Sequence, residues 1–135
     1  MSDYTVADRD QAVDLMADYP GFGEMLSYTR ALEAEQVALT WRRMPAGTGG
    51  KGSYGHRHHT QEELYLVLSG EVEAKIEGDV FTLGRGMAIR VPTGAFRSIH
   101  NDGPDEAQLV ICSVRIDDPR ADVDAKPNFW PDDNT

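Results

Sequence analysis

Two stretches of this 135-residue chain carry glycine, proline, histidine and charged residues at fixed intervals, and these intervals constrain the fold more than any other feature. The first stretch, residues 50–70, reads G-x5-H-x-H-x4-E-x6-G. The second stretch, residues 86–101, reads G-x5-P-x-G-x2-R-x3-N. Because glycine and proline at such intervals mark turns, both stretches predict short strands that are joined by tight turns.

Together the two stretches resemble the two signature motifs of the cupin family. The resemblance covers roughly residues 39–114 and implies an all-β fold, a small jelly-roll β-barrel that commonly forms dimers. The usual second motif of the family has a histidine where this chain has Arg97. The family includes dioxygenases, decarboxylases, isomerases, epimerases and non-catalytic binding proteins, so the resemblance implies no single substrate.

Alternation of apolar and polar side chains supports the same fold class. Val37, Leu39 and Trp41 alternate with small or polar residues, and the apolar residues of 71–77 alternate with charged ones. Residues 64–68 are all apolar or aromatic, which predicts a strand that is covered on both faces. Turn signals recur between these segments, as expected for an all-β sandwich or barrel.

The length and the turn signals divide the chain into three parts. One domain with a single core is expected at this length. We predict an N-terminal segment over residues 1–24, a β-barrel over 25–116 and an acidic tail over 117–135. Residues 109–114 form the last predicted core strand, because the chain beyond them is rich in aspartate and proline.

Both ends of the chain carry features that lie outside the predicted barrel. Asp8 and Gln11 have the spacing of a capping box, which predicts a short N-terminal helix that Pro20 ends. The acidic tail contains Phe129 and Trp130. Two large aromatic side chains in such a segment are expected to pack, either on the barrel itself or on a neighbouring subunit.

Charge and cysteine content narrow the choice of partners. The formal net charge is -10 and the pI is about 4.7, so binding to nucleic acid or to an anionic membrane is not expected. No apolar run is long enough to span a membrane, and no signal peptide is expected. The single cysteine, Cys112, lies in an apolar run, which suits a buried thiol and a reducing cytoplasm. A small molecule or another protein is the expected partner.

Two histidines and a glutamate in the first motif form a candidate metal site. His56 and His58 are two positions apart on a predicted strand, so their side chains share one face, and Glu63 returns after a turn. Two imidazoles and one carboxylate form the facial triad that suits Fe(II), and the same ligands also accept Mn, Ni, Cu or Zn. The pattern therefore predicts a divalent metal ion, with Fe, Mn, Ni and Zn as candidates.

Arg97 complicates this prediction, because a guanidinium group cannot coordinate a metal ion. At about 4 Å and an effective dielectric constant of about 20, a dication and this arginine repel each other by roughly 8 kcal/mol. Two arrangements stay open. In one, the triad holds a metal ion and Arg97 binds an anionic substrate. In the other, Glu63 and Arg97 form a buried salt bridge and no metal binds.

Two further side chains are candidates for the site. Tyr65 shares a face with Glu63, so it either offers a phenol near the metal or packs in the core. Arg43 shares a face with Trp41, so it either meets an anion inside the barrel or lies at an exposed strand end. We name Glu63, Arg97 and Tyr65 as the candidate catalytic residues.

These patterns leave two classes of function open. The first is a metal-dependent enzyme of the dioxygenase, isomerase or decarboxylase type, which acts on a small anionic or oxygenated compound. The second is a non-catalytic binding or regulatory module without a metal. The family resemblance implies a homodimer, and Leu64, Leu66 and Leu68 on one strand face are expected to be covered by a sheet or by a second subunit.

Overall fold

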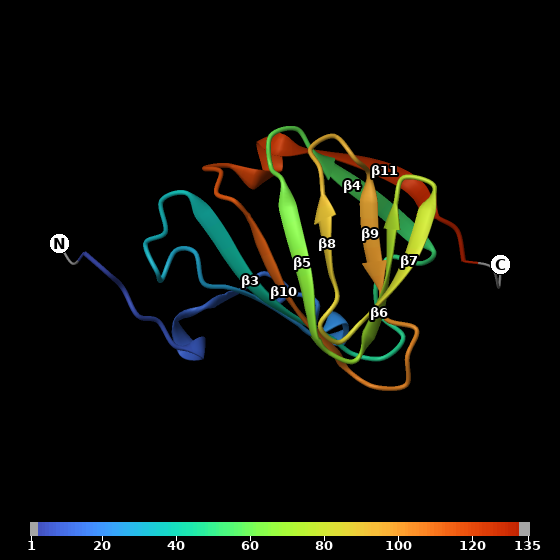
Figure 1. Ribbon diagram of the computed structural model, residues 1–135, viewed down its shortest axis with the longest axis horizontal. Coiled ribbons are helices and arrows are strands. Elements are labelled where there is room, and N and C mark those ends of the chain that lie inside the picture. The colour runs from blue at the N-terminus through green and yellow to red at the C-terminus, as the bar shows by residue number, and fades with distance from the viewer. Residues whose placement is uncertain (1–2, 133–135) are drawn as a thin grey trace.

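The computed structural model describes residues 3–132, so residues 1–2 and 133–135, at the ends of the predicted N-terminal segment and acidic tail, lie outside the described residues. The chain forms two antiparallel sheets that face each other, as Figure 1 shows. The predicted all-β fold of the jelly-roll type is therefore confirmed. No helix within residues 3–132 has the length and apolar character needed to cross a membrane.

The strands within residues 3–132 divide between the two sheets. The first sheet contains six strands: β1 (Val13–Asp14), β2 (Glu24–Ser27), β3 (Val37–Met44), β10 (Ala107–Val114), β5 (Glu63–Ser69) and β8 (Ala88–Val91). The second sheet contains five: β11 (Val123–Trp130), β4 (Ser53–His58), β9 (Arg97–His100), β6 (Glu71–Ile76) and β7 (Asp79–Gly84). Three short 3-10 helices lie outside the sheets: η1 (Arg9–Gln11), η2 (Pro20–Phe22) and η3 (Pro119–Asp122).

The core lies between the two sheets, because side chains alternate between the faces of each strand. On β5, Tyr65 and Val67 point inward and are buried. They meet Leu109 of β10 and, from the other sheet, Val72 and Ala74 of β6 in one apolar cluster. The clean alternation on β6 predicted from the sequence therefore matches its inward and outward faces.

The glycine that ends the first motif shows why the motif needs this residue. Gly70 joins β5 to β6 with a φ of 72°, a backbone conformation that other residues rarely adopt. A Cβ atom at this position would also lie 2.7 Å from the carbonyl oxygen of Glu106. The turn therefore requires glycine both for its backbone angle and for the close approach of the neighbouring loop.

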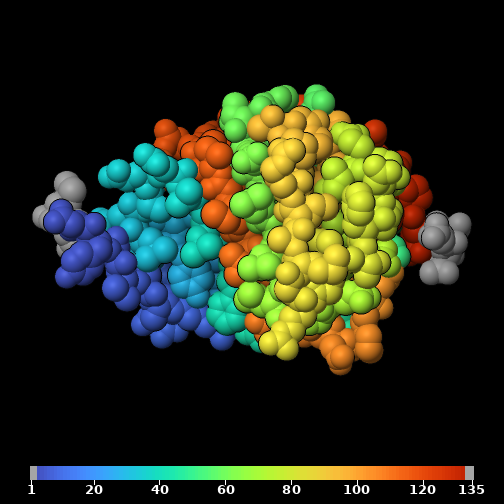
Figure 2. All heavy atoms as spheres, in the orientation of Figure 1, coloured from blue at the N-terminus to red at the C-terminus, as the bar shows by residue number. Residues whose placement is uncertain are grey.

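The outer face of the six-stranded sheet is also apolar. Leu64, Leu66 and Leu68 of β5 are 47%, 40% and 43% exposed, so the predicted cover over them is absent within the described chain. Figure 2 shows this side of the molecule, with β8 in gold beside β5 in green. In the strand register Leu66 lies beside Val110 of β10, which lies beside Trp41 of β3.

The N-terminal segment differs from its prediction. The capping box of Asp8 and Gln11 is present and begins η1, but this helix ends after one turn and does not continue to Pro20. Val13 pairs with Ser27 in the first sheet instead. The backbone hydrogen bonds offered by β2 outweigh the weak helical pattern of this short segment.

The acidic tail differs more strongly, because it contains a strand. The prediction that residues 109–114 form the last core strand is wrong, since β11 pairs with β4 over residues 123–126 and again at Trp130. Figure 1 shows this last strand, in red, along the edge of the second sheet beside β4. Phe129 and Trp130 are 6% exposed, so the tail aromatics pack on their own barrel.

Phe129 provides a test of this docking. A Cβ atom on Gly55 of β4 would lie only 2.4 Å from its ring, so the ring fills a space that glycine leaves open. We expect Phe129→Ala to lower the free energy of unfolding by about 3 kcal/mol or more, the usual cost of removing a buried aromatic side chain. Urea denaturation measures the change. The control is Phe81→Ala on β7, since Phe81 is 45% exposed and its loss should cost far less. Equal losses for both variants would contradict the packing of β11.

Candidate metal centre

The triad predicted from the sequence converges inside the barrel. His56 and His58 point inward from β4, and Glu63 points inward from the start of β5 in the opposite sheet. One ligand atom of each residue lies within 4.8 Å of the others, so a single metal ion can contact all three. His59, one position further along the chain, is exposed and instead faces Asp124 on β11.

Both histidines are in the protonation state that a metal requires. Burial, with the nearby charge of Arg97, lowers the pKa of His56 to about 4. Burial also lowers the pKa of His58, although Glu63 and Asp122 partly oppose this shift. Both imidazoles are therefore neutral at pH 7, and each has a lone pair to offer to a metal ion.

Glu63 uses its two oxygens differently. Its Oε1 accepts from the hydroxyl of Tyr65 at 3.1 Å and forms an ion pair with Nη2 of Arg97. Oε1 also lies 4.0 Å from Nε2 of His58, whereas Oε2 makes no hydrogen bond with any residue in 3–132 and remains able to accept a further partner. The salt bridge of the second arrangement is thus present, yet it occupies only one of the two carboxylate oxygens.

Arg97 and Tyr65 hold this carboxylate in place. The guanidinium group of Arg97 is fully enclosed, and its Nη1 also donates to the carbonyl oxygen of Ala95 at 3.1 Å. Tyr65 is 4% exposed, and burial raises the pKa of its phenol, so the hydroxyl remains protonated and donates to Glu63. The donor set of two neutral imidazoles and one oriented carboxylate fits a divalent metal ion.

A fourth residue, Asp122, supports the site and was missed by the sequence analysis. Its Oδ2 lies 3.3 Å from Nδ1 of His58, and neither atom has a hydrogen-bond partner within residues 3–132. Its Oδ1 accepts from the backbone and the hydroxyl of Thr60 at 3.0 and 2.8 Å. A carboxylate beside Nδ1 favours a proton on that nitrogen, which leaves Nε2 free to bind a metal ion.

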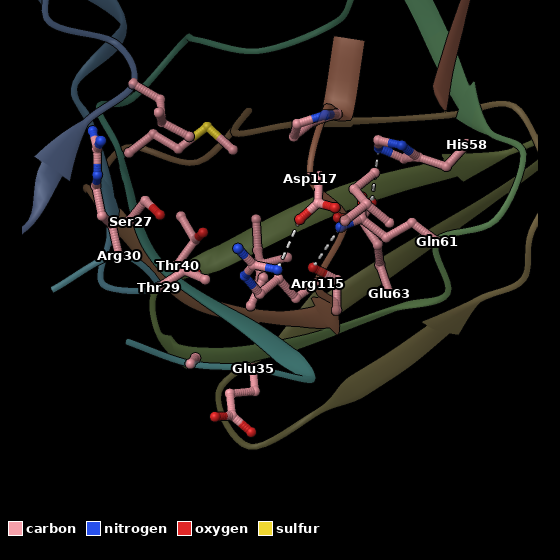
Figure 3. A pocket seen from close by; sticks show the side chains of 18 of the residues that line it. Ser27, Thr29, Arg30, Glu35, Thr40, His58, Gln61, Glu63, Arg115 and Asp117 are labelled. Atoms are coloured by element: carbon pink, nitrogen blue, oxygen red, sulfur yellow. Dashed lines mark hydrogen bonds and ion pairs between the residues drawn. The ribbon is translucent and has the colours of Figure 1, made fainter. Parts of the chain in front are cut away.

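The triad lies between two cavities. The first, of about 840 Å³, is called the acidic chamber because it is lined by four carboxylates (Glu33, Glu35, Glu63 and Asp117) and two arginines (Arg30 and Arg115). Figure 3 shows His58, Gln61 and Glu63 on one side of this chamber and Ser27 and Thr29 on the other. The second cavity, of about 540 Å³, shares His56 and Glu63 with the first but is otherwise lined largely by apolar and aromatic residues.

The two arginines at the end of β3 take opposite faces. Arg43 lies outside, where its Nε donates to Glu106 at 2.7 Å and its Nη1 donates to Glu24 at 2.9 Å. Of the two predicted positions for Arg43, the structure therefore has the one at the outer strand end and not the one inside the barrel. Its neighbour Arg42 points inward and lines the second cavity, which we call the Arg42 chamber.

Asp122 gives a test of the site that does not depend on catalysis. We expect Asp122→Asn to weaken binding of Mn(II) or Zn(II) about 10-fold to 100-fold, because outer carboxylates that orient a histidine ligand have effects of this size. Isothermal titration calorimetry measures the affinity. The control is Asp124→Asn, which removes a carboxylate that pairs with Arg57 and His59 outside the barrel. The proposed role of Asp122 is contradicted if both variants bind the metal equally well.

Comparison with known proteins identifies the family. The cupin domain model matches residues 41–113. A 61-residue segment is 31% identical to mannose-1-phosphate guanylyltransferase from Escherichia coli K12, covering 45% of this chain but only 13% of that enzyme.

A cupin protein from Bacteroides fragilis has a TM-score of 0.68 at 20% identity, covering 87% of this chain and 88% of that one. A sugar phosphate isomerase of the cupin superfamily from Silicibacter pomeroyi has a TM-score of 0.69 at 16% identity, covering 93% and 95%. Since the family match spans more than half of the chain and contains both motifs, the protein belongs to the cupin family.

Proposed function

We propose that this cupin binds a divalent metal ion through His56, His58 and Glu63 and acts on a small anionic or oxygenated organic compound. The observation that carries the proposal is the convergence of His56, His58 and Glu63, whose ligand atoms lie within 4.8 Å of one another, on a carboxylate that Arg97 and Tyr65 hold in place. A purely structural salt bridge gives no reason for two neutral histidines to point at the same carboxylate. The candidate metals are Fe, Mn, Ni and Zn.

The chain's own residues have distinct roles in this proposal. The bound ion supplies Lewis-acid chemistry, which polarises an oxygen atom of the ligand. Arg97 fixes the orientation of Glu63 through their ion pair, and Tyr65 holds a proton at its hydroxyl beside the same oxygen. An isomerase reaction has support from the similarity of fold to the Silicibacter pomeroyi sugar phosphate isomerase, and dioxygenase and decarboxylase chemistry are the other candidates.

A second candidate function is a binding module without a metal. The ion pair between Glu63 and the fully buried Arg97 favours it, because this pair offsets the burial of both charges without a metal ion. In that case the same barrel holds a small ligand without chemistry. Metal affinity separates the two functions.

The test is a titration of untagged protein with Fe(II), Mn(II), Ni(II) and Zn(II), combined with elemental analysis of the purified protein. We expect one equivalent of metal, and we expect Glu63→Gln to lose both metal affinity and about 3 kcal/mol of stability, because it removes a ligand and leaves Arg97 without its carboxylate. Arg97→His should bind metal at least tenfold more tightly, a gain of about 1.4 kcal/mol, since it removes a positive charge and adds a possible ligand.

The matched control for these variants is His59→Ala, which removes an exposed histidine that does not belong to the triad. Its metal affinity should equal that of the wild type. A wild-type protein that binds none of the four metals stoichiometrically would contradict the metal-dependent function.

We also propose that the protein is a cytoplasmic homodimer that buries the outer apolar face of its six-stranded sheet. Support comes from the exposed leucines of β5 and from the apolar row of Leu66, Val110 and Trp41 across three neighbouring strands. Contiguous apolar surface of this kind marks an interaction site in many proteins.

Light scattering tests the assembly. The wild type should have the mass of a dimer at micromolar concentration, and Leu66→Lys should have the mass of a monomer, because it places a charge in the centre of the buried face. Val80→Lys is the control, since Val80 of β7 is similarly exposed but belongs to the other sheet. A monomeric wild type would contradict the proposal.

A further inference from the structure

Arg42 is a buried arginine without a carboxylate partner. It is 7% exposed, and it forms no ion pair with any residue in 3–132. Its Nη1 donates to the backbone oxygens of Glu24 and Arg43 at 3.0 and 2.6 Å. Its Nε and Nη2 have no partner in the same part of the chain. These two nitrogens form the edge of a guanidinium group that binds a carboxylate or phosphate with two parallel hydrogen bonds.

The contrast with Arg97 shows that this arrangement is unusual within the same barrel. Arg97 lines the same cavity and is more enclosed than Arg42, but Glu63 neutralises its charge. Burial lowers the pKa of Arg42, and attraction to Asp14 offsets this only in part, while the group remains protonated at pH 7. The two unpartnered nitrogens of Arg42 are accessible rather than sealed in the core, so a counter-ion in the adjoining cavity would stabilise this charge.

The surroundings of Arg42 match a small organic ligand. The Arg42 chamber has a volume of about 540 Å³, which lies in the range of small-molecule sites. Met16, Tyr19 and Phe22 of the N-terminal segment line it, together with Tyr54 of β4. Tyr19, Phe22 and Tyr54 are 61%, 45% and 60% exposed, so their rings lie at the open side of the cavity, where they can cover an apolar or ring-shaped part of a ligand.

The chamber also reaches the triad. His56 and Glu63 belong to its lining, so a ligand that contacts Arg42 and fills the chamber extends to the predicted metal ligands. On the other side of the triad the acidic chamber has more carboxylates than arginines, and its charged groups other than Glu63 are exposed, so it attracts an anionic group less than the buried Arg42 does. The two cavities therefore differ in the charge that they accept.

We propose that Arg42 binds the carboxylate or phosphate group of a small organic anion, whose apolar or ring-shaped part lies against Tyr19 and Phe22. This inference rests on the proposed function, which takes a small anionic compound as the ligand. It assigns the anionic group to Arg42, and Arg97 remains the partner of Glu63. Anion binding at Arg42 does not require a metal ion, so the two proposals can fail separately.

The test is an NMR titration of 15N-labelled protein with three probes: benzoate, phenyl phosphate and the neutral benzamide. Each titration is done on chelator-treated protein and repeated with Zn(II). Binding of an anion should shift the amide signals of Gly49, Ser53 and Ser98, which line the Arg42 chamber. Benzoate or phenyl phosphate should bind at least tenfold more tightly than benzamide, and the tighter of the two anions identifies the favoured group.

Arg42→Gln should weaken anion binding at least tenfold, and Arg42→Lys should be intermediate, because it keeps the charge but loses the two-pronged edge. Arg43→Gln is the matched control, since this neighbouring arginine lies outside the barrel and should not affect binding. If Arg42→Gln does not fold, the lysine variant and the comparison of benzoate with benzamide on the wild type decide the question.

Three results would overturn the inference: wild-type affinity in Arg42→Gln, equal affinity for benzamide and both anions, or no anion binding below about 10 mM. Shifts confined to residues of the acidic chamber would overturn it as well. Metal binding measured on the same samples reports separately on the triad. Metal binding without an effect of Arg42 leaves the proposed function standing alone.

Discussion

The ion pair between Glu63 and Arg97 is the interaction on which the inner structure of this barrel depends. Glu63 belongs to β5 of the six-stranded sheet and Arg97 to β9 of the five-stranded sheet, so the pair joins the two sheets through the core. Because Arg97 is fully enclosed, burying its charge has a free-energy cost, and only a correctly placed Glu63 carboxylate offsets it. That carboxylate is also a member of the triad, and Arg97 lies directly opposite His56 in the strand register. Stability and site geometry are therefore fixed by the same contact.

Some residues that surround the triad lie outside the family match over residues 41–113, although Arg42 and Arg97 lie within it. Asp122, which faces His58, precedes the last strand, and Tyr19 and Phe22 of the Arg42 chamber come from the N-terminal segment. A barrel shared by many proteins supplies the inward-facing histidines, whereas the ends of the chain supply what surrounds them. This is the physical reason why family membership alone identifies neither ligand nor reaction.

The sequence correctly predicted which side chains of one strand share a face. The inward direction of His56 with His58, and of Glu63 with Tyr65, follows from the period of two. It failed to find Arg42, because Leu39 and Trp41 suggested that the face of Arg43 was the inner one. Both faces of β3 carry apolar side chains, so hydrophobicity does not tell them apart.

The C-terminal strand could not be predicted for a different reason. β11 is an edge strand that contains Pro127 and has a break in its register between Lys126 and Trp130, so it lacks the alternation that identifies an inner strand. Its position depends on pairing with β4, a partner about 70 residues away in the chain, and such pairing leaves no local signal.

Charge is distributed unevenly between the two cavities beside the triad. The chain as a whole has a formal net charge of -10, which repels anions at long range, but salt reduces this repulsion beyond about 8 Å at physiological ionic strength. At contact distance the buried charge of Arg42 has the stronger effect, because the charged groups of the acidic chamber other than Glu63 are exposed to solvent. In the proposed binding mode the anionic group of the ligand lies toward Arg42 and its uncharged or hydroxyl-bearing part lies across the triad. Since His56 and Glu63 border both cavities, that orientation decides which atom of the ligand lies beside the predicted metal ligands.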